Sequence, residues 1–534
     1  MGARRGWIAG FTVLAAGMAL HPFNRALAAD TPDPVLSLML EKGMITQDEA
    51  AKVQAQVDAR QTNLLAQYQY QMPNSGSVWK ISKGIKDIEL YGDLRTRFED
   101  RMENDPSGGN IDLQRYRFAA RVGLRGDLYD DFYYGFRLET SSNPRSTMVT
   151  LGTANPAPYS KSSDGINIGQ IYMGWHPEDW FEITAGKMPN PLYTSSMVWS
   201  PSINPEGLAE QFKHKVGEVD FFANFSQFLY QDQNPVSATP DLGLGTEGAG
   251  QNANNVFLIA WQGGLNYHIT TNVSFKVAAT FYEYYGQKAS GLIPGISPYF
   301  GDAYVGEGAY TGAGTGNAAN GYSGYGASSS QSTYYSQYGN GYANNQTGIN
   351  NLQVVEVPFE INFKISKLDA RIFGDAAYNI QGNQRAQAAA AAYSAYLADQ
   401  AQASTVKPFS PQTGDDKAYQ IGFALGSEGA LGLVNGTTAK KHAWELRTYW
   451  QHVEQYSLDP NLLDLDFNAG AENLQGIYAA AAYGFTDNFI GTFRYGYASR
   501  INKLLGTGGT GTDIPQINPI TQYSIFQVDL TVKF

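Results

Sequence analysis

The sequence ends on Tyr523-Ser-Ile-Phe-Gln-Val-Asp-Leu-Thr-Val-Lys-Phe534, a stretch in which apolar and polar side chains alternate. In a β-strand, residues of the same parity lie on the same face. One face of the predicted strand is therefore apolar and comprises Phe526, Val528, Leu530, Val532 and Phe534. A soluble β-protein can contain such a strand, but it is also the repeat unit of a membrane barrel, whose apolar face meets lipid and whose polar face lines a lumen.

The opposite end of the sequence has the pattern of an export signal. Arg4 and Arg5 provide a positive start, residues 7–20 form an apolar run, and Ala26-Leu-Ala28-Ala29 offers small residues for cleavage. We predict that residues 1–29 are a signal peptide. No later stretch approaches the roughly 18–20 apolar residues that a membrane-spanning helix requires, so we expect no such helix after it.

The composition narrows the class of protein further. Cysteine is absent, which argues against a small secreted fold held by disulfides. The 35 Tyr, 27 Phe and 8 Trp fit aromatic girdles at two membrane interfaces, and the 58 Gly fit many turns. The formal charge of −12 would become −15 on loss of Arg4, Arg5 and Arg25 with the signal. This balance makes nucleic acid an unsuitable partner.

A short segment after the signal has a helical pattern. Pro34-Val-Leu-Ser-Leu-Met-Leu-Glu-Lys42 is followed by a capping Gly43, and Thr46-Gln-Asp-Glu49 is a capping box that opens a second helix. We predict a periplasmic helical segment over 30–72 and a linker over 73–84. The helices could associate between protomers as a short coiled coil, or could form a loosely attached tail.

From residue 85 onward the alternation of the terminal stretch recurs. The sequence predicts an all-β fold over 85–534, a 16-stranded antiparallel transmembrane β-barrel. The predicted strands are 85–101, 112–127, 131–142, 165–176, 180–188, 206–214, 217–231, 254–268, 272–286, 351–365, 367–381, 416–426, 441–457, 473–485, 488–501 and 521–534.

The connections between these strands alternate between tight turns and long loops. Tight turns are predicted at 127–131, 176–180, 214–217, 268–272, 365–367 and 485–488. Outer-membrane barrels have this asymmetry, with short periplasmic turns and long extracellular loops. The connection 426–441 is an exception, because it is long on the side of the turns. No motif recurs at a fixed period, which argues against a propeller.

Three loops have distinctive compositions. Residues 302–348 consist largely of Gly, Tyr, Ser, Asn and Ala and are predicted to form a surface loop without a core. Residues 386–403 are rich in Ala and Gln and are predicted to form a helix. Residues 188–206 combine four prolines with Tyr193 and Trp199, so we predict that this stiff, apolar loop bends into the barrel as a constriction.

The polar parity of several strands is rich in arginine. Parity predicts a pore-lining basic wall that comprises Arg95, Arg97, Arg101, Arg115, Arg117, Arg121, Arg125, Arg137, Arg494 and Arg500. Facing acids are predicted at Glu206 and Glu210, near the constriction loop. Such a wall could set up a transverse field that orients solutes and biases ion passage. Alternatively, these arginines pair with Glu89, Asp93, Glu99, Glu139 and Asp529 and only satisfy a polar interior.

Signals for catalysis or cofactor binding are weak. There is no cysteine nucleophile, and no Ser and Asp can be tied to His452 to form a catalytic triad. Gly243-Leu-Gly-Thr-Glu-Gly248 matches a dinucleotide fingerprint only as a string, since no helix is predicted after it. No metal-ligand spacing is present. The sequence predicts neither an enzyme nor a bound cofactor or metal.

Two stretches resemble a known family. Leu38-Met-Leu-Glu-Lys-Gly-Met-Ile-Thr-Gln-Asp-Glu-Ala50 is similar to the segment that precedes the barrel in bacterial putative porins and, more loosely, in phosphate-selective porins. Gly186-Lys-Met-Pro-Asn-Pro-Leu-Tyr193, followed by Val198-Trp-Ser-Pro-Ser-Ile-Asn-Pro-Glu-Gly207, resembles the loop after the fifth strand of the putative porins. The resemblance implies a Gram-negative outer-membrane channel, and resemblance to other sixteen-stranded porins implies a homotrimer.

These observations lead to one expectation and two alternatives. We expect a porin, embedded in outer-membrane lipid, through which small hydrophilic solutes and ions diffuse passively. The first alternative is a substrate-selective channel for phosphate-like anions, with the arginines as a binding ladder. The second is a structural or secretion barrel that the N-terminal helices plug or tether.

Overall fold

The computed structural model describes residues 84–104, 110–141, 146–152, 165–231, 256–285, 352–387, 411, 413–460, 462–503, 505, 507 and 520–534, with residues 42, 46, 52 and 82. The chain divides into two compact units, Met1–Ile81 and Ser82–Phe534. The predicted signal peptide, the loop 302–348 and, apart from Lys42, Thr46 and Lys52, the predicted N-terminal helical segment lie outside the described residues. Of the helix predicted over 386–403, residues 386 and 387 are described and are helical.

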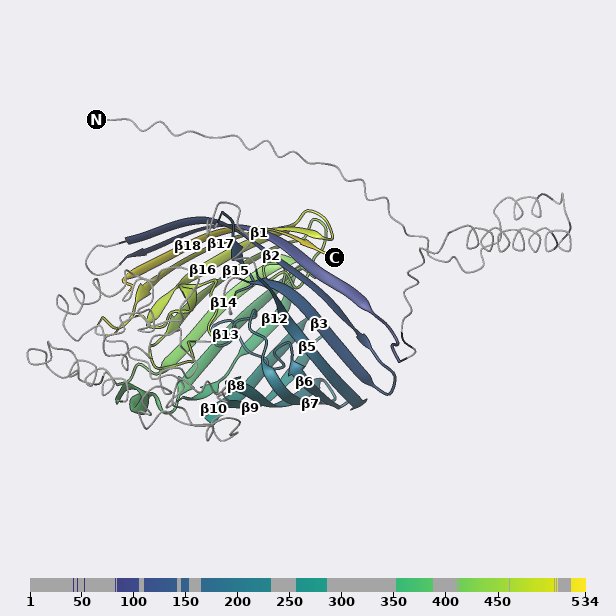
Figure 1. Ribbon diagram of the computed structural model, residues 1–534, viewed down its shortest axis with the longest axis horizontal. Helices are drawn as coiled ribbons and strands as arrows, with labels where there is room; N and C mark the ends of the chain where they lie inside the picture. Colours follow the sequence, from purple (N-terminus) through teal and green to yellow (C-terminus); the bar gives the residue numbers. More distant parts are fainter. Residues whose placement is uncertain are drawn as a thin grey trace, which may run out of the picture. The chain divides into compact units, whose positions relative to one another are not determined.

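The second unit consists almost entirely of strands (Figure 1). The elements are β1 (Glu89–Asn104), β2 (Asn110–Asp127), β3 (Phe132–Ser141), β4 (Val149–Thr150), β5 (Gly165–Glu178), β6 (Phe181–Lys187), β7 (Glu206–Val216), β8 (Val219–Gln231), β9 (Val256–Thr270), β10 (Val273–Tyr285), β11 (Gln353–Glu356), β12 (Phe359–Ile365), β13 (Leu368–Asn379), β14 (Lys417–Ser427), β15 (Trp444–Val453), the 3₁₀ helix η9 (Asn468–Gly470), β16 (Leu474–Gly484), β17 (Phe489–Arg500) and β18 (Gln522–Lys533). Among the described residues, no helix is long and apolar enough to cross a membrane.

The strands form one closed antiparallel sheet. Apart from β4, β11 and β12, consecutive strands pair with each other, and β1 pairs with both β2 and β18, which closes the ring. β3 and β4 both lie along β2, and β11 and β12 both lie along β10, so each of these pairs fills one place in the ring. The eighteen strands therefore occupy sixteen places, and the predicted 16-stranded barrel is confirmed.

Every predicted strand overlaps a strand of this barrel, but two are divided or shortened. The predicted strand 351–365 is divided into β11 and β12 at Pro358, because proline has no N–H to donate to the ladder. The Pro358 carbonyl still accepts a hydrogen bond from Ala278 N at 3.1 Å. The predicted strand 441–457 is shorter in the structure, because residues at both of its ends belong to connections.

The outer face of the barrel is apolar, as the alternation predicts. The register opposes Phe98 with Val528 and Leu94 with Val532 on this face, and the C-terminal Phe534 exchanges backbone hydrogen bonds with Gly92. Exposed apolar side chains continue around the ring at Val122, Ile166, Met173, Phe221, Trp261, Ile372, Ile421, Leu446, Ile477, Phe493 and Leu530. A water-soluble protein would not expose a continuous belt of this kind, whereas hydrocarbon solvates it.

The two rims of the barrel differ. One rim, called the turn-side rim, carries the tight connections after β2, β5, β7, β9, β12 and β16, and it lies at the right of Figure 1, where the C-terminus is marked. The connection between β14 and β15, residues 428–443, is the long exception that the sequence indicates. It folds inward, so that Leu433 is 0% exposed and Val434 is 2% exposed.

Candidate functional site

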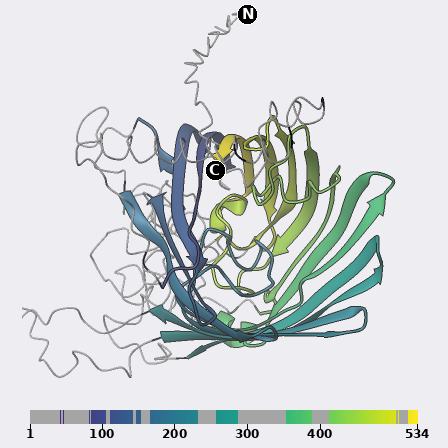
Figure 2. The same cartoon turned by 90° about the vertical axis from the view of Figure 1, so that its right-hand side faces the viewer.

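The constriction loop, residues 188–205, leaves and rejoins the wall at two glycines. Gly186 and Gly207 face each other in the register of β6 and β7, with positive φ values of 120° and 153°. A Cβ at Gly186 would lie 2.3 Å from the Ile171 carbonyl oxygen, and one at Gly207 would lie 2.2 Å from that of Gln227. Only glycine suits both positions. Figure 2 shows the blue-teal coil of the loop inside the ring of strands.

Polar contacts hold the loop against the far wall of the lumen. Thr194 Oγ1 donates to Glu356 Oε1 of β11 and Ser195 Oγ donates to Asp375 Oδ2 of β13, each at 2.5 Å. Tyr193 N donates to Gln262 Oε1 of β9 at 2.9 Å, and Gln262 Nε2 donates back to the Tyr193 carbonyl at 2.8 Å. The loop thus reaches from β6 and β7 across the lumen to β9, β11 and β13.

Apolar packing adds to these hydrogen bonds. Trp199, only 4% exposed, packs edge to face on Phe228 with 5.9 Å between ring centroids, and its Nε1 donates to the Ile203 carbonyl at 3.0 Å. Met197 and Val198 are buried in the same cluster. The predicted inward bend of the loop is therefore present, with Trp199 in its core and Tyr193 beside the space under the loop. Its role in permeation remains a prediction.

A second stretch, residues 454–473, also crosses the lumen and is called here the lumen segment. At one end the hydroxyls of Tyr230 and Tyr284 donate to Asp459 Oδ2, at 2.8 and 2.6 Å. At the other end Arg97 NH1 of β1 donates to Asp466 Oδ1 at 2.6 Å. Between them, Ser200 N of the constriction loop donates to the Leu462 carbonyl at 2.6 Å. The two inward segments therefore support each other.

Most of the predicted basic wall is paired with carboxylates. Asp529 of β18 accepts hydrogen bonds from Arg97, with Nε 2.7 Å from Oδ1, and from Arg494. Glu99 accepts two hydrogen bonds from Arg115, at 2.8 and 2.6 Å. Further ion pairs are Arg121–Asp93, Arg125–Glu89 and Arg137–Glu139. All five acids of the alternative interpretation are thus partners of these arginines.

Burial corrects the prediction of a basic wall that lines open water. Six of the ten arginines are 8% exposed or less: Arg97, Arg101, Arg115, Arg117, Arg494 and Arg500. The lumen segment and residues 428–443 lie against this wall; for example, Arg494 NH2 donates to the Val434 carbonyl at 2.9 Å. Arg95, Arg121, Arg125 and Arg137 keep more exposure. The six buried arginines, together with Arg95, Arg121, Arg125 and Arg137 at their edge, are called here the paired arginine cluster.

The prediction that Glu206 and Glu210 face the lumen is wrong. In the register, Glu206 opposes Lys187 and forms a 2.8 Å ion pair with it, and Glu210 opposes Ile183 on the same outward face. The inward positions nearest the loop are Gly207 and Ala209, small residues that leave room for the constriction loop. The two glutamates share the outward parity of Leu208 and Phe212, so polarity alone assigned them to the wrong face.

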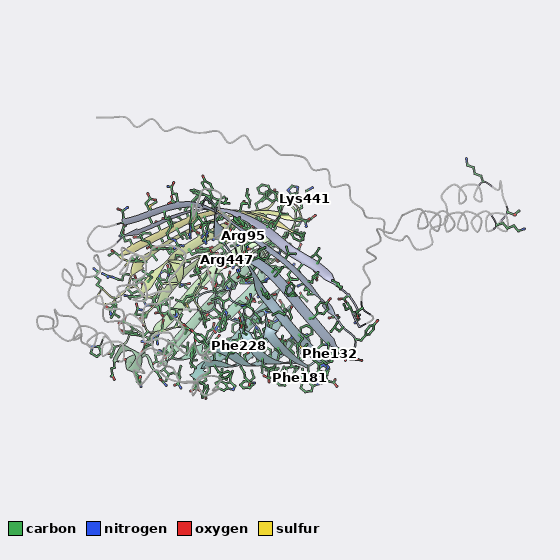
Figure 3. All side chains as sticks on the ribbon, viewed as in Figure 1. Arg95, Phe132, Phe181, Phe228, Lys441 and Arg447 are labelled. Atoms are coloured by element: carbon green, nitrogen blue, oxygen red, sulfur yellow. The ribbon has the colours of Figure 1, made fainter. Side chains whose placement is uncertain are left out.

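Three basic residues that face the lumen outside the predicted basic wall were missed. Lys276 of β10, Arg371 of β13 and Arg447 of β15 all have inward parity. Figure 3 labels Arg447 together with Arg95 of the arginine cluster. Arg371 and Arg447 border a cavity of about 370 Å³ under the constriction loop. The inward position of Arg371 could have been predicted from the alternation in residues 367–381, which places Arg371, Phe373 and Asp375 on one face.

The described residues offer no evidence of catalysis or metal binding. His452 lies on the outward face, with its ring nitrogens 3.0 Å from Gln475 Oε1 and 3.2 Å from Glu454 Oε1. No group of three or more side chains suited to a metal ion occurs in the described ranges.

The lumen segment carries two aspartates whose pKa values shift in opposite directions. Burial alone would raise the pKa of Asp466, but the charge and hydrogen bond of Arg97 outweigh burial and hold that pKa well below its usual range. Burial and the charge of Asp466 raise the pKa of Asp464 to about 7. Asp466 therefore stabilises the folded segment fully above the unfolded-state pKa of about 3.9 and loses its effect in acid. The contribution of Asp464 is present in acid and is lost as pH rises towards 7.

We expect protection of backbone amides 462–471 from hydrogen exchange to be greatest near about pH 4, to fall in stronger acid as Asp466 is protonated, and to fall gradually towards pH 7 as the contribution of Asp464 is lost. In Asp466→Asn the decline on the acid side should disappear and protection should be lower throughout. Asp464→Asn is the matched control and should keep the acid-side decline. Identical acid-side profiles for the unmodified chain and Asp466→Asn would contradict this assignment.

Comparisons with known proteins give a family match over most of the chain. Residues 107–534 match a family model described as putative porin. No curated protein matches. Similar solved structures include the anion-selective porin from Comamonas acidovorans, with 9% identity, TM-score 0.38, and coverage of 84% of this chain and 99% of the porin. Another is Pseudomonas putida OprB, with 10% identity, TM-score 0.41, and coverage of 84% and 94%.

Proposed function

This chain belongs to the putative porin family, and from that membership we propose that it forms a water-filled channel in a Gram-negative outer membrane, through which small hydrophilic solutes and ions diffuse passively. The observation that carries the proposal is the closed ring of sixteen strand places with an apolar outer belt and a polar interior. Outer-membrane lipid would solvate the belt, and water would occupy the lumen that the inward segments leave free.

In this proposal the constriction loop sets the pore size. It is anchored on β9, β11 and β13, so it narrows the lumen near the middle of the wall. The paired arginine cluster has a different role, because its charges are largely neutralised. It holds the lumen segment in place through Arg97 and Asp466.

The proposal includes export, topology and assembly. Residues 1–29 would be removed as a signal peptide, and 30–72 would stay in the periplasm with the turn-side rim. A homotrimer would account for polar groups on the outward face of β7 and β8, where Gln227 Nε2 lies 3.4 Å from Glu210 Oε1. A carboxylate in this position is costly against hydrocarbon but acceptable in a subunit interface.

Planar-bilayer recording of the purified full-length chain tests the channel proposal. We expect discrete conductance steps that are ohmic in KCl, because a water-filled pore has no saturable site for these ions. Protein that inserts into the bilayer but gives no steps would exclude a diffusion channel.

A second candidate is an anion-selective channel. It is favoured by the basic side chains that remain exposed to the lumen, of which Lys276 has no carboxylate within 4.0 Å among the described residues. In a KCl gradient the sign of the reversal potential distinguishes the candidates. A potential near zero fits the general pore, and a potential near the chloride equilibrium value fits the anion channel. The secretion-barrel alternative involves helices outside the described residues.

A further inference from the structure

The lumen contains two cavities that share one arginine. The first, of about 370 Å³, lies between the constriction loop and β12–β15, and its lining includes Tyr193, Arg371, Phe373 and Arg447. The second, of about 320 Å³, lies at the turn-side rim near His268 and also includes Arg371. A solute that leaves the space under the constriction loop by this route therefore passes the guanidinium of Arg371.

The guanidinium of Arg371 has N–H donors that are not used in hydrogen bonds to other described residues. Its Nε donates to Asn362 Oδ1 at 2.7 Å, and its NH1 lies 3.5 Å from Glu360 Oε2. Neither Nη atom donates a hydrogen bond to another residue in the part of the chain that the structure describes, and the side chain is 28% exposed. NH1 is thus ion-paired with Glu360 without a hydrogen bond, and the planar fork can still offer both Nη atoms to a carboxylate through two parallel hydrogen bonds. Arg371 thus differs from the buried arginines of the opposite wall.

Aromatic rings accompany the cations in this cavity. The guanidinium of Arg447 lies over the Phe373 ring, 5.7 Å from its centroid, and Phe373 packs edge to face on Tyr449 at 6.3 Å. Lys276 Nζ lies over the Tyr193 ring at 3.9 Å. Rings at the wall of a pocket favour a ligand that is itself apolar and flat.

Carboxylates accompany the basic side chains around this cavity, so accessible hydrogen-bond donors rather than net charge select its ligand. Arg447 is neutralised by Glu445, whose Oε1 accepts its Nε and NH2 at 3.1 and 2.8 Å. Glu360 pairs with Arg371, and Glu356 and Asp375 lie behind Thr194 and Ser195 of the cavity wall, where those hydroxyls donate to them. The exposed guanidinium of Arg371 is therefore the group that can offer hydrogen bonds to an anion, and a volume of about 370 Å³ suits a small molecule, for which sites of roughly 300–1,000 Å³ are usual.

We propose that this cavity is a binding subsite, on the permeation path, for small aromatic carboxylates of the size of benzoate. The carboxylate binds the Nη atoms of Arg371, and the ring lies against Tyr193 and Phe373. This inference rests on the proposed channel function, since the ligand is a solute in transit. The subsite retards and concentrates such solutes without any chemical step.

The test is block of the ion current through the full chain in planar bilayers. Millimolar benzoate should reduce the KCl current in a saturable manner, whereas acetate, which lacks the ring, and benzamide, which lacks the charge, should not. Arg371→Gln should raise the half-blocking concentration of benzoate by about tenfold, because a charge-assisted bidentate contact is lost. Phe373→Leu, which keeps the arginine and removes the ring, should weaken benzoate block in the same direction.

Lys213→Gln is the matched control. Lys213 is 63% exposed in its side chain, pairs with Glu182 and lines neither cavity, so its replacement removes one positive charge elsewhere in the barrel. Its benzoate block should equal that of the unmodified chain. Conducting channels without saturable benzoate block, with equal block by acetate, or with equal block in Arg371→Gln would overturn the subsite and leave the channel intact. Absence of any conductance would overturn the channel proposal instead.

Discussion

Asp529→Asn is expected to destabilise the barrel by about 3–5 kcal/mol, the usual cost of removing one partner from a buried ion pair. Asp529 is 1% exposed, accepts hydrogen bonds from Arg97 and Arg494, and lies 4.0 Å from NH1 of Arg95. The substitution keeps the shape of the side chain but leaves these guanidiniums with too little negative charge. The measurement is urea-induced unfolding of the purified protein in detergent, followed by tryptophan fluorescence.

The matched control for this variant is Glu89→Gln at the end of the same cross-strand series. Glu89 pairs with Arg125 through a 2.6 Å contact, but both side chains are more than half exposed. Water screens the Glu89–Arg125 pair, so the control should change the unfolding midpoint far less than Asp529→Asn does. Equal shifts for the two variants would show that the arginine cluster is solvated and would contradict its assignment as a buried anchor.

Replacing residues 192–203 by a short Gly-Ser linker is expected to raise the single-channel conductance several-fold, because this segment crosses the lumen and narrows its cross-section. Gly186, Gly207 and the flanking strands stay unchanged, so the wall of the barrel should close as before. The measurement is conductance in KCl in planar bilayers, with heat-modifiable migration in gels as the check on folding. An unchanged conductance would place the narrowest point elsewhere in the lumen.

A milder variant keeps the loop and tests whether its two hydrogen bonds to the wall fix its position. Thr194→Val with Ser195→Ala removes the two hydrogen bonds to Glu356 and Asp375 but keeps the buried Trp199. This loop should stay in the lumen and move more, so the conductance should become noisier with only a small change in its mean. A rise as large as that of the deletion would mean that the hydrogen bonds alone hold the loop inside.

Most strands of this protein could be predicted from the sequence because they obey the same local rule, from which β7 departs at Glu206 and Glu210. A side chain that meets hydrocarbon is apolar at every second position, as in Phe526–Phe534, and this rule depends on neither partners nor register. Pro358 divides the predicted strand 351–365 into β11 and β12 because it lacks a backbone N–H donor. The alternation of apolar and polar residues does not reveal this break.

The lining of the lumen was less predictable, because it depends on which loops fold inward. Glu206 and Glu210 are polar yet face outward, since Gly207 and Ala209 must make room for the constriction loop. The arginines of β1 and β2 were assigned to the correct face, but their burial depends on the lumen segment, whose inward course no sequence pattern indicates. Arg371 was overlooked because its importance comes from the cavity beside it.

The paired arginine cluster sits where the first and last strands of the ring meet. Arg97 belongs to β1, Asp529 belongs to β18, and they lie directly opposite in the register. Until the final strand has joined, the first strand presents cations whose counter-charge is still missing, so completing the cylinder and neutralising its interior are one event. A barrel that lacks β18 would therefore keep unpaired arginines on β1, and pairing of β18 with β1 would neutralise them.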